Sequence, residues 1–275
     1  MLWWKLVVTP LIIGVVTLVG RRWGPRVAGL LVGLPLTSAP VSVFLATERG
    51  TAFAAGAAVG AIVGFFTSCC CIAAYALVAR RREWPVALLA GLTVLTGLAF
   101  LLNDIPFSLG SAFATSATGI VVLWAVVIRP VETVGEVDTK EEAPAAAPAW
   151  DVPARMLMVT AMVAGLTAAA TVLGPRASGV LSAFPILGGV LSVFTHRHDG
   201  PRAANTVIRA MIIGSIPGIL FFAVVGVLAA PGRLAVTYAA AAVVALGSGA
   251  IVSHLTRPRL SDRLALAAQP TRRAA

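Results

Sequence analysis

Nine long apolar runs fill most of the chain and leave few folds open to it. A helix that crosses a bilayer needs about 20 mostly apolar residues, and most of these runs approach or exceed that length. The charged fraction of 12% is well below the roughly 25% that is usual for soluble domains. We therefore expect an all-α, polytopic membrane helix bundle. The nine expected spans are 6–20, 27–46, 51–79, 85–102, 107–128, 154–173, 177–195, 203–230 and 234–254.

Arginine and lysine are distributed unequally over the loops between these spans. Sixteen cationic residues fall on one side of the membrane and four on the other, with Arg209 inside a span. Cytoplasmic loops carry the excess of positive charge, which places the N-terminus outside and the C-terminus in the cytoplasm. The net charge of +10 therefore reports topology and contact with the lipid bilayer, and no nucleic acid is expected as a partner. The Arg-, Ala-, Val- and Gly-rich composition indicates a bacterial plasma (inner) membrane.

An internal repeat runs through the chain with an offset of 150 residues. Between positions 24 and 64, thirteen of forty-one residues are identical to the residue 150 positions later. Each unit holds four spans, and because the offset of five spans is odd, the units enter the membrane from opposite sides as an inverted-topology repeat. The expected organisation is a first four-helix repeat (1–105), a central connecting helix (106–128), a disordered acidic cytoplasmic linker (129–153), a second inverted repeat (154–256) and a basic cytoplasmic tail (257–275).

Prolines interrupt the second and the seventh span at matching positions. Proline removes a backbone donor and frees carbonyl groups, which in a bilayer must be buried in protein or face a wet cavity. Transporters with inverted repeats often bind substrate where such broken helices meet. The carbonyls and nearby hydroxyls are candidates for binding a small cation or polar solute, and a kink that serves packing alone is the alternative. The candidate substrate-binding residues are Pro35, Thr37, Ser38, Ser42, Ser182, Pro185, Gly188 and Ser192.

A second group of candidates lies in the fifth span. Ser108, Ser111, Thr115 and Thr118 are spaced to share one face of a helix. A polar stripe in a spanning helix is expected to face protein or water, so Ser111 and Thr115 are candidates for lining a substrate cavity. Hydrogen bonding between helices explains the same stripe without a function.

Ionisable residues near the expected membrane are few. Glu48 and Asp104 lie near the outer ends of the second and fourth spans, and Arg209 lies inside the eighth. All three are candidates for coupling or charge recognition, although Arg209 also fits a role in which it snorkels to the headgroups. His196 and His198 are expected on a cytoplasmic loop. Because no carboxylate is evident in the membrane interior, coupling would use a funnel carboxylate, a backbone-bound sodium ion or no ion.

Catalysis and cofactor binding find little support in the sequence. The consecutive cysteines 69–71 point in different directions on a helix, so no metal site is expected there. Ser248 and His254 lie six residues apart on one helix and therefore on different faces, which argues against a serine-protease pair. We expect no enzyme, no catalytic residue, no metal and no cofactor.

Short motifs recur in both units. They are Ala28-Gly29-Leu30 with Pro35 and Gly50, and Ser178-Gly179-Val180 with Phe184-Pro185 and Gly200. These motifs are similar to those of GlpM-like small membrane proteins. The resemblance implies a duplicated four-span protein, and that family is associated with exopolysaccharide production. The duplicated, inverted architecture also resembles the drug/metabolite transporters by analogy, but the glutamate that small multidrug carriers place in their first span is missing from the first and sixth spans here.

Two functions remain open from the sequence. The first is a transporter or permease that moves a small polar solute, an ion or a lipid-linked precursor by alternating access. The alternative is a non-catalytic accessory protein of the cell-envelope or exopolysaccharide machinery, acting with a partner of that machinery or as a homo-oligomer.

Overall fold

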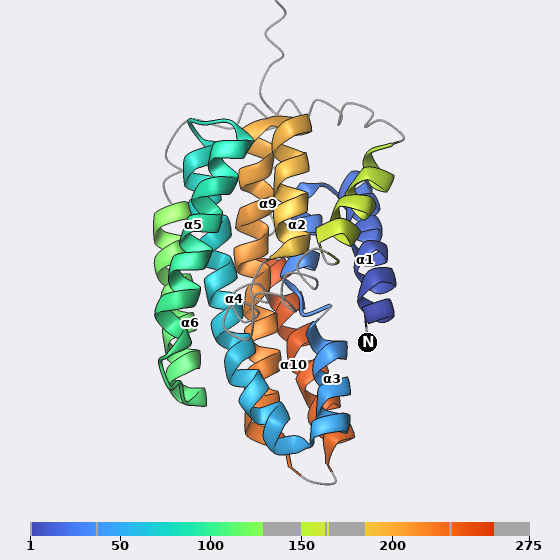
Figure 1. Ribbon diagram of the computed structural model, residues 1–275, viewed down its shortest axis with the longest axis vertical. Helices are drawn as coiled ribbons and strands as arrows, with labels where there is room; N and C mark the ends of the chain where they lie inside the picture. The colour runs from blue at the N-terminus through green and yellow to red at the C-terminus, as the bar shows by residue number, and fades with distance from the viewer. Residues whose placement is uncertain are drawn as a thin grey trace, which may run out of the picture.

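The computed structural model describes residues 2–36, 38–128, 150–162, 164, 185–230 and 233–255. All regular structure within these residues is helical, and five of the helices are long and apolar enough to cross a membrane. The helices are α1 (Leu2–Trp23), α2 (Pro25–Gly33), α3 (Ser38–Arg49), α4 (Thr51–Ala79), α5 (Trp84–Asn103), α6 (Leu109–Leu123), the π-helical turn η1 (Trp124–Ile128), α9 (Ile186–Leu228) and α10 (Leu234–Leu255). The five candidate spans are α4, α5, α6 with the start of η1, α9 and α10, and they lie side by side along the bundle (Figure 1).

The observed helices differ from the expected spans in three places. The expected span 27–46 is two shorter helices, α2 and α3. The seventh and eighth spans join in α9, and part of the expected spans 154–173 and 177–195 lies outside the described residues. The helical segment after the linker begins at Asp151, so the linker ends before Pro153, and residues 129–149 lie outside the described chain.

Two glycines set sharp bends at matching positions of the chain. Gly50 separates α3 from α4 with φ 87° and ψ 173°, and Gly200 divides α9 with φ 83° and ψ 176°. Because L-residues rarely adopt this conformation, glycine is required at both bends. We call 186–199 the first arm of α9 and 201–228 the second arm. The arms meet at the upper end of the bundle in Figure 1, whereas α3 meets α4 at the lower end.

The core of the bundle is formed by α4 and α9. In their most apolar stretches 44% of α4 and 56% of α9 is buried, against 17% for each of α5, α6 and α10. Ile62 of α4 and Ile212 of α9 are fully buried, whereas Leu101 of α5 and Leu246 of α10 are 67% and 68% exposed. The outer helices therefore present large apolar side chains to the surroundings of the bundle.

Candidate functional site

Both prolines that were predicted to break their spans lie within three residues of the start of a helix. In the first break α2 ends at Gly33, and α3 begins at Ser38. In the second, α9 begins immediately after Pro185. The Ala39 N–H donates to the carbonyl of Pro35 at 2.9 Å, and the Gly189 N–H donates to the carbonyl of Pro185 at 2.6 Å. Proline suits both positions because the first turn of a helix needs no N–H donor.

Protein fills the surroundings of the first break. Pro35 is buried, and Leu34 lies near Gly249 of α10 and Pro217 of α9. A methyl group built on Gly249 would lie 3.7 Å from the side chains of both Leu34 and Pro217. Of the other candidates at this break, Ser38 is partly buried, and Thr37 lies outside the described residues.

The hydroxyl of Ser42 is satisfied by a second hydroxyl. Ser42 is 6% exposed, and its Oγ lies 2.8 Å from the phenolic oxygen of Tyr238 in α10. The ring of Phe221 packs against that of Tyr238 at 6.1 Å between centroids and against Phe222 at 5.1 Å. Aromatic rings therefore fill the contact between α3, α10 and the second arm.

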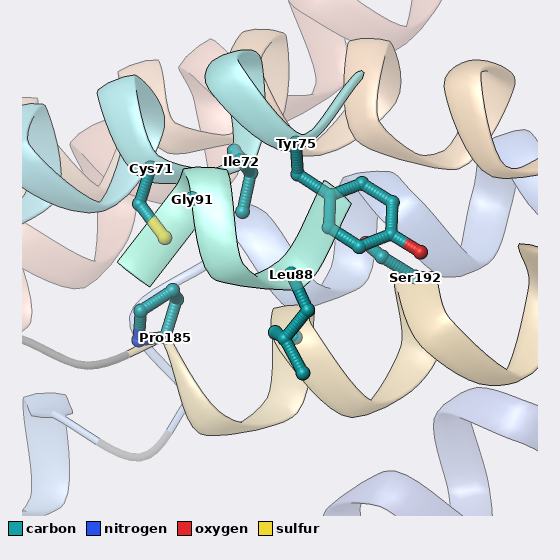
Figure 2. A pocket seen from close by; sticks show the side chains of 8 residues that line it. Cys71, Ile72, Tyr75, Leu88, Gly91, Pro185 and Ser192 are labelled. Carbon is teal, nitrogen blue, oxygen red and sulfur yellow. The ribbon is translucent and has the colours of Figure 1, made fainter. Parts of the chain in front are cut away.

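A small cavity lies at the second break. Pro185 and Ser192 line it together with Tyr75 of α4 and Leu88 of α5 (Figure 2), and Gly189 also belongs to the lining. Cys71, Ile72 and Gly91 complete the lining. The cavity volume is about 10 Å³, which is at the lower limit for a single water molecule.

Ser192 belongs to the residues that line the cavity, but its hydroxyl is not exposed to the enclosed space, whose surface is apolar. Its side chain is 1% exposed, and its Oγ has no hydrogen-bond partner among the described residues. A buried hydroxyl without a partner costs about 1–3 kcal/mol, so most are paired with protein or with ordered water. Gly188 does not line the cavity but faces Met211 of the second arm, and Ser182 lies outside the described residues.

A buried Tyr–His pair lies one turn beyond Ser192. The hydroxyl of Tyr75, whose ring lines the cavity, is 3.0 Å from Nδ1 of His196. The two rings meet edge to face, with 5.9 Å between centroids. His196 is 7% exposed and lies within the first arm, so its expected place on a loop is corrected. Tyr75 carried no signal in the sequence, because it is one aromatic residue in a continuous apolar run.

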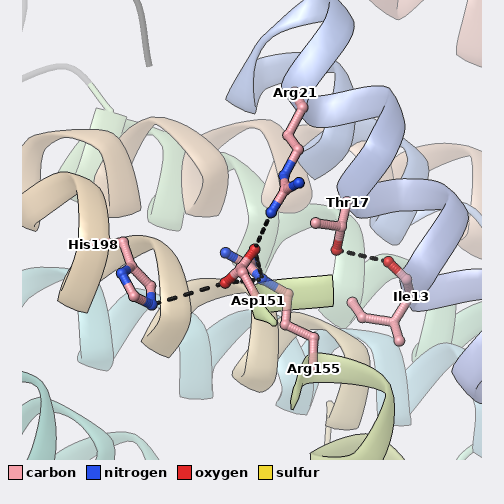
Figure 3. Close-up of polar contacts among 6 residues, drawn as sticks. All are labelled: Ile13, Thr17, Arg21, Asp151, Arg155 and His198. Carbon is pink, nitrogen blue, oxygen red and sulfur yellow. Dashed lines mark hydrogen bonds and ion pairs between the residues drawn. The ribbon is translucent and has the colours of Figure 1, made fainter. Parts of the chain in front are cut away.

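A buried ion cluster joins three elements near the other end of the first arm (Figure 3). The Asp151 carboxylate is 1% exposed and accepts hydrogen bonds from Arg21 Nη2 at 2.9 Å and from Arg155 Nε at 3.0 and 3.1 Å. His198 Nε2 lies 3.8 Å away. The guanidinium of Arg155 also lies 4.9 Å above the ring of Phe194. Charge-assisted hydrogen bonds of this kind offset the cost of burying the carboxylate.

The sequence contained a signal for this cluster. Asp151 and Arg155 are four residues apart, which is the spacing of a helical ion pair. The signal was missed because residue 151 was assigned to the disordered linker. The third member, Arg21, comes from α1 and is 130 residues away in sequence, so no local pattern connects it to the pair.

The polar stripe of α6 faces away from the bundle. Ser111, Thr115 and Thr118 are exposed, and none of them lines the cavity described above. Ser108 caps the helix instead: its Oγ accepts from the Ser111 N–H at 3.1 Å, and its own N–H donates to Ser111 Oγ at 2.9 Å. In the described chain the stripe therefore occupies the outer surface and does not reach the core as expected.

The inward face of α6 lies one residue away from that stripe. Ala112, Ser116 and Ile120 are buried there. The Ser116 hydroxyl donates to the carbonyl of Ile62 in α4 at 3.3 Å. Hydrogen bonding between helices was the alternative explanation for the polar residues of the fifth span. Such a bond is present, but Ser116 makes it, and not Ser111 or Thr115.

The three charged candidates do not line the cavity. Asp104 is exposed at the end of α5, sixteen residues beyond Leu88, which corresponds to about 24 Å along the helix. Arg209 is partly buried in the second arm, nine residues beyond Gly200. The side chain of Glu48 lies outside the description.

Long apolar helices with apolar outer faces define the class of this protein as a multi-pass membrane helix bundle. No protein-family model matches the chain, and neither a curated protein nor a solved structure does. Within the described residues no three His, Cys, Asp or Glu side chains form a group suited to holding a metal ion.

Proposed function

We propose that this protein is a transporter or permease of a bacterial inner membrane. It moves a small polar solute, an ion or a lipid-linked precursor by alternating access between two inverted halves. The observation that carries the proposal is the pair of helix starts and bends 150 residues apart, Pro35 with Gly50 and Pro185 with Gly200. In inverted-repeat transporters such discontinuous helices build the substrate site.

The bends support an inverted relation between the halves. Gly50 and Gly200 have nearly the same backbone conformation. The helices that meet at Gly50 join at one end of the bundle, and those that meet at Gly200 join at the opposite end (Figure 1). Two copies of one hairpin that point in opposite directions are what an inverted repeat requires.

The outer helices give independent support. The helices α5 and α10 begin 150 residues apart, at Trp84 and Leu234. From 83–102 and 233–252, the residues at 19 of 20 matched positions share the same burial class. Equivalent helices therefore turn equivalent faces toward the bundle, which favours a shared ancestral unit.

The charge distribution supports an orientation for these halves. With the N-terminus outside, the bend at Gly200 and the Asp151 cluster lie on the cytoplasmic side, and the bend at Gly50 lies outside. Arg21, Arg155 and His198 then belong to the cytoplasmic surface, where cationic residues are enriched. The cluster ties the first arm to α1 and to the segment after the linker, which suits a contact that holds the cytoplasmic side closed.

The proposal is tested by substituting the two prolines. Pro35→Ala, Pro185→Ala and the double variant are compared in proteoliposomes, with sodium, potassium, chloride, simple carboxylates and small polyols as probes. We expect flux to fall most in the double variant while membrane abundance stays near that of the wild type. Pro10→Ala is the control, because Pro10 lies inside α1 and its repeat position is Thr160. Unchanged flux in the double variant would contradict the proposal.

One observation favours the accessory function instead. The hydroxyls of Ser111, Thr115 and Thr118 face outward from α6, and a polar stripe in a spanning helix is better satisfied by another helix than by lipid. Photocrosslinking from Thr115 in native membranes distinguishes the two functions, with the apolar, 65% exposed Val121 as the control position. A stable adduct with an envelope protein at Thr115 alone, together with no flux in liposomes, would favour the accessory function.

A further inference from the structure

The Asp151 cluster docks one helical segment on the end of another. The guanidinium of Arg155 binds the Asp151 carboxylate and lies 4.9 Å from the centre of the Phe194 ring. His198 Nε2 lies 3.8 Å from the same carboxylate. Phe194 and His198 are four residues apart and therefore share one face of the first arm. A cation, an aromatic ring and a carboxylate thus hold the segment 151–162 against the first arm, close to the glycine bend.

The first repeat carries a cation, an aromatic ring and a carboxylate at the matched positions. The matched pairs are Arg155 with Lys5, Phe194 with Phe44, and His198 with Glu48. Lys5 is in the first turn of α1, and Phe44 and Glu48 are four residues apart near the end of α3. The carboxylate belongs to the receiving helix in this repeat, because the position that matches Asp151 is Met1. The start of α1 and the end of α3 therefore have complementary charges at positions where the second repeat makes a contact.

The two ends of α1 are in different situations in this structure. Arg21, in the last turn of α1, donates to the Asp151 carboxylate at 2.9 Å, so this end of the helix is tied to the cluster. The start of α1 lies partway along the bundle in Figure 1, above the lower end at which α3 meets α4. In the orientation proposed above, the contact on the cytoplasmic side is formed, and the first turn of α1 is apart from the outer end of α3. One helix therefore carries a cation of each contact.

We propose that the first turn of α1 and the end of α3 form the outer gate of the transporter, closed by an ion pair between Lys5 and Glu48 with the lysine over Phe44. This inference rests on the proposed function and names the contact that alternates with the Asp151 cluster. When inverted repeats rock against each other, a contact that closes one side has a counterpart that closes the opposite side. An exposed ion pair contributes little to stability, whereas breaking a buried cluster is costly. The cluster is therefore the stronger of the two contacts, which explains why it is the one formed in this structure.

The test applies a zero-length crosslinker to the purified full chain in liposomes. A water-soluble carbodiimide joins a lysine amine to a carboxylate as an amide only where the two groups touch. The chain contains two lysines, Lys5 and Lys140, so few products compete with the expected one. The amide between Lys5 and Glu48 is quantified by mass spectrometry, and its rate of formation reports how often the outer gate is closed.

Two variants open the cluster, and a third is the control. Arg21→Gln releases α1 from Asp151, which keeps Arg155 as its partner. Asp151→Asn retains the shape of the side chain but removes the charge that holds both arginines. Arg22→Gln is the control, because the Arg22 guanidinium lies 5.6 Å from the Trp23 ring and does not contribute to the ion pairs of the cluster. Loss of one charge-assisted hydrogen bond corresponds to about a tenfold change in the ratio of two states.

We expect the amide to form slowly in the wild type, about tenfold faster in Arg21→Gln and in Asp151→Asn, and at the wild-type rate in Arg22→Gln. Circular dichroism verifies that each variant keeps the helicity of the wild type. Absence of the amide from all four proteins would overturn the inference, and so would a rate that stays constant when the cluster is opened. The crosslink requires no substrate, so it decides the gate separately from transport. An amide that responds to the cluster in a protein without flux would support the alternating contact and contradict the transport function.

Discussion

The Ser42 region and the Ser192 region lie 150 residues apart, at matched positions of the two proposed repeats. Each serine follows a proline break by seven residues and precedes a glycine bend by eight. The Ser42 hydroxyl is paired with the Tyr238 hydroxyl. The residue that matches Tyr238 is Leu88, which offers no polar group, and the Ser192 hydroxyl has no partner among the described residues. Both regions have a proline before a helix and a glycine at a bend, but the side chains that pack between the helices differ. The difference teaches that proline and glycine positions specify the backbone, whereas the packed side chains specify any site. The region around Ser192, which contains the cavity, is therefore the one to examine.

The ion cluster joins Arg21 of α1 to Asp151, Arg155 and His198, and its loss is the largest effect we expect. Asp151→Ala leaves Arg155, which is 5% exposed, buried without its counter-charge, and the free energy of unfolding falls by about 3–5 kcal/mol. The measurement is an SDS titration followed by circular dichroism. The double variant Asp151→Leu with Arg155→Met should recover much of the loss. Equal instability of the single and double variants would show that the contribution is not electrostatic.

The two bends should respond alike if they are equivalent. Gly50→Ala and Gly200→Ala force an alanine into a conformation that glycine alone adopts readily, which costs about 1–3 kcal/mol at each site. Gly56→Ala is the control, because Gly56 is inside α4 and a Cβ there meets nothing within 4 Å. The same SDS titration measures all three variants. A loss at one bend only would break the comparison of the halves.

The smallest expected effect is that of the tyrosine hydroxyl, which is measured by comparing tyrosine with phenylalanine at positions 238 and 88. Tyr238→Phe removes the partner of Ser42 and should cost about 1 kcal/mol of unfolding free energy. At the matched position, Leu88→Tyr should be more stable than Leu88→Phe by a similar amount, about 1 kcal/mol, because only tyrosine satisfies Ser192. Unfolding titrations of the three variants and the wild type measure both differences. Equal stability of the two Leu88 variants would mean that Ser192 is already satisfied by another group.

The features that the sequence predicted are those with a backbone cause. Proline at 35 and 185 excludes a helical N–H, so the helix starts near both residues follow from covalent chemistry. Glycine at 50 and 200 coincides with bends that other residues rarely adopt. Both pairs were visible in the sequence through the repeat.

The features that the sequence did not predict depend on which face of a helix is buried. In α4 and α6 nearly every residue is apolar or small, so the pattern along the chain does not reveal the inward face. Ser111 and Thr115 were therefore expected inside, although Ser116 makes the contact to α4. Tyr75 with His196 and Arg21 with Asp151 are pairs of distant residues, and only the packed structure brings them together.

The relation between the halves is tested most directly by labelling beside the two bends. Ala52 and Arg202 are 150 residues apart, and both are exposed. Ala52→Cys and Arg202→Cys are introduced separately after the cysteines at 69–71 have been replaced by alanine. A membrane-impermeant maleimide is then applied to spheroplasts and to inverted vesicles. We expect the cysteine at 52 to react only from outside and the cysteine at 202 only from the cytoplasmic side. Reaction of both from the same side would contradict an inverted repeat.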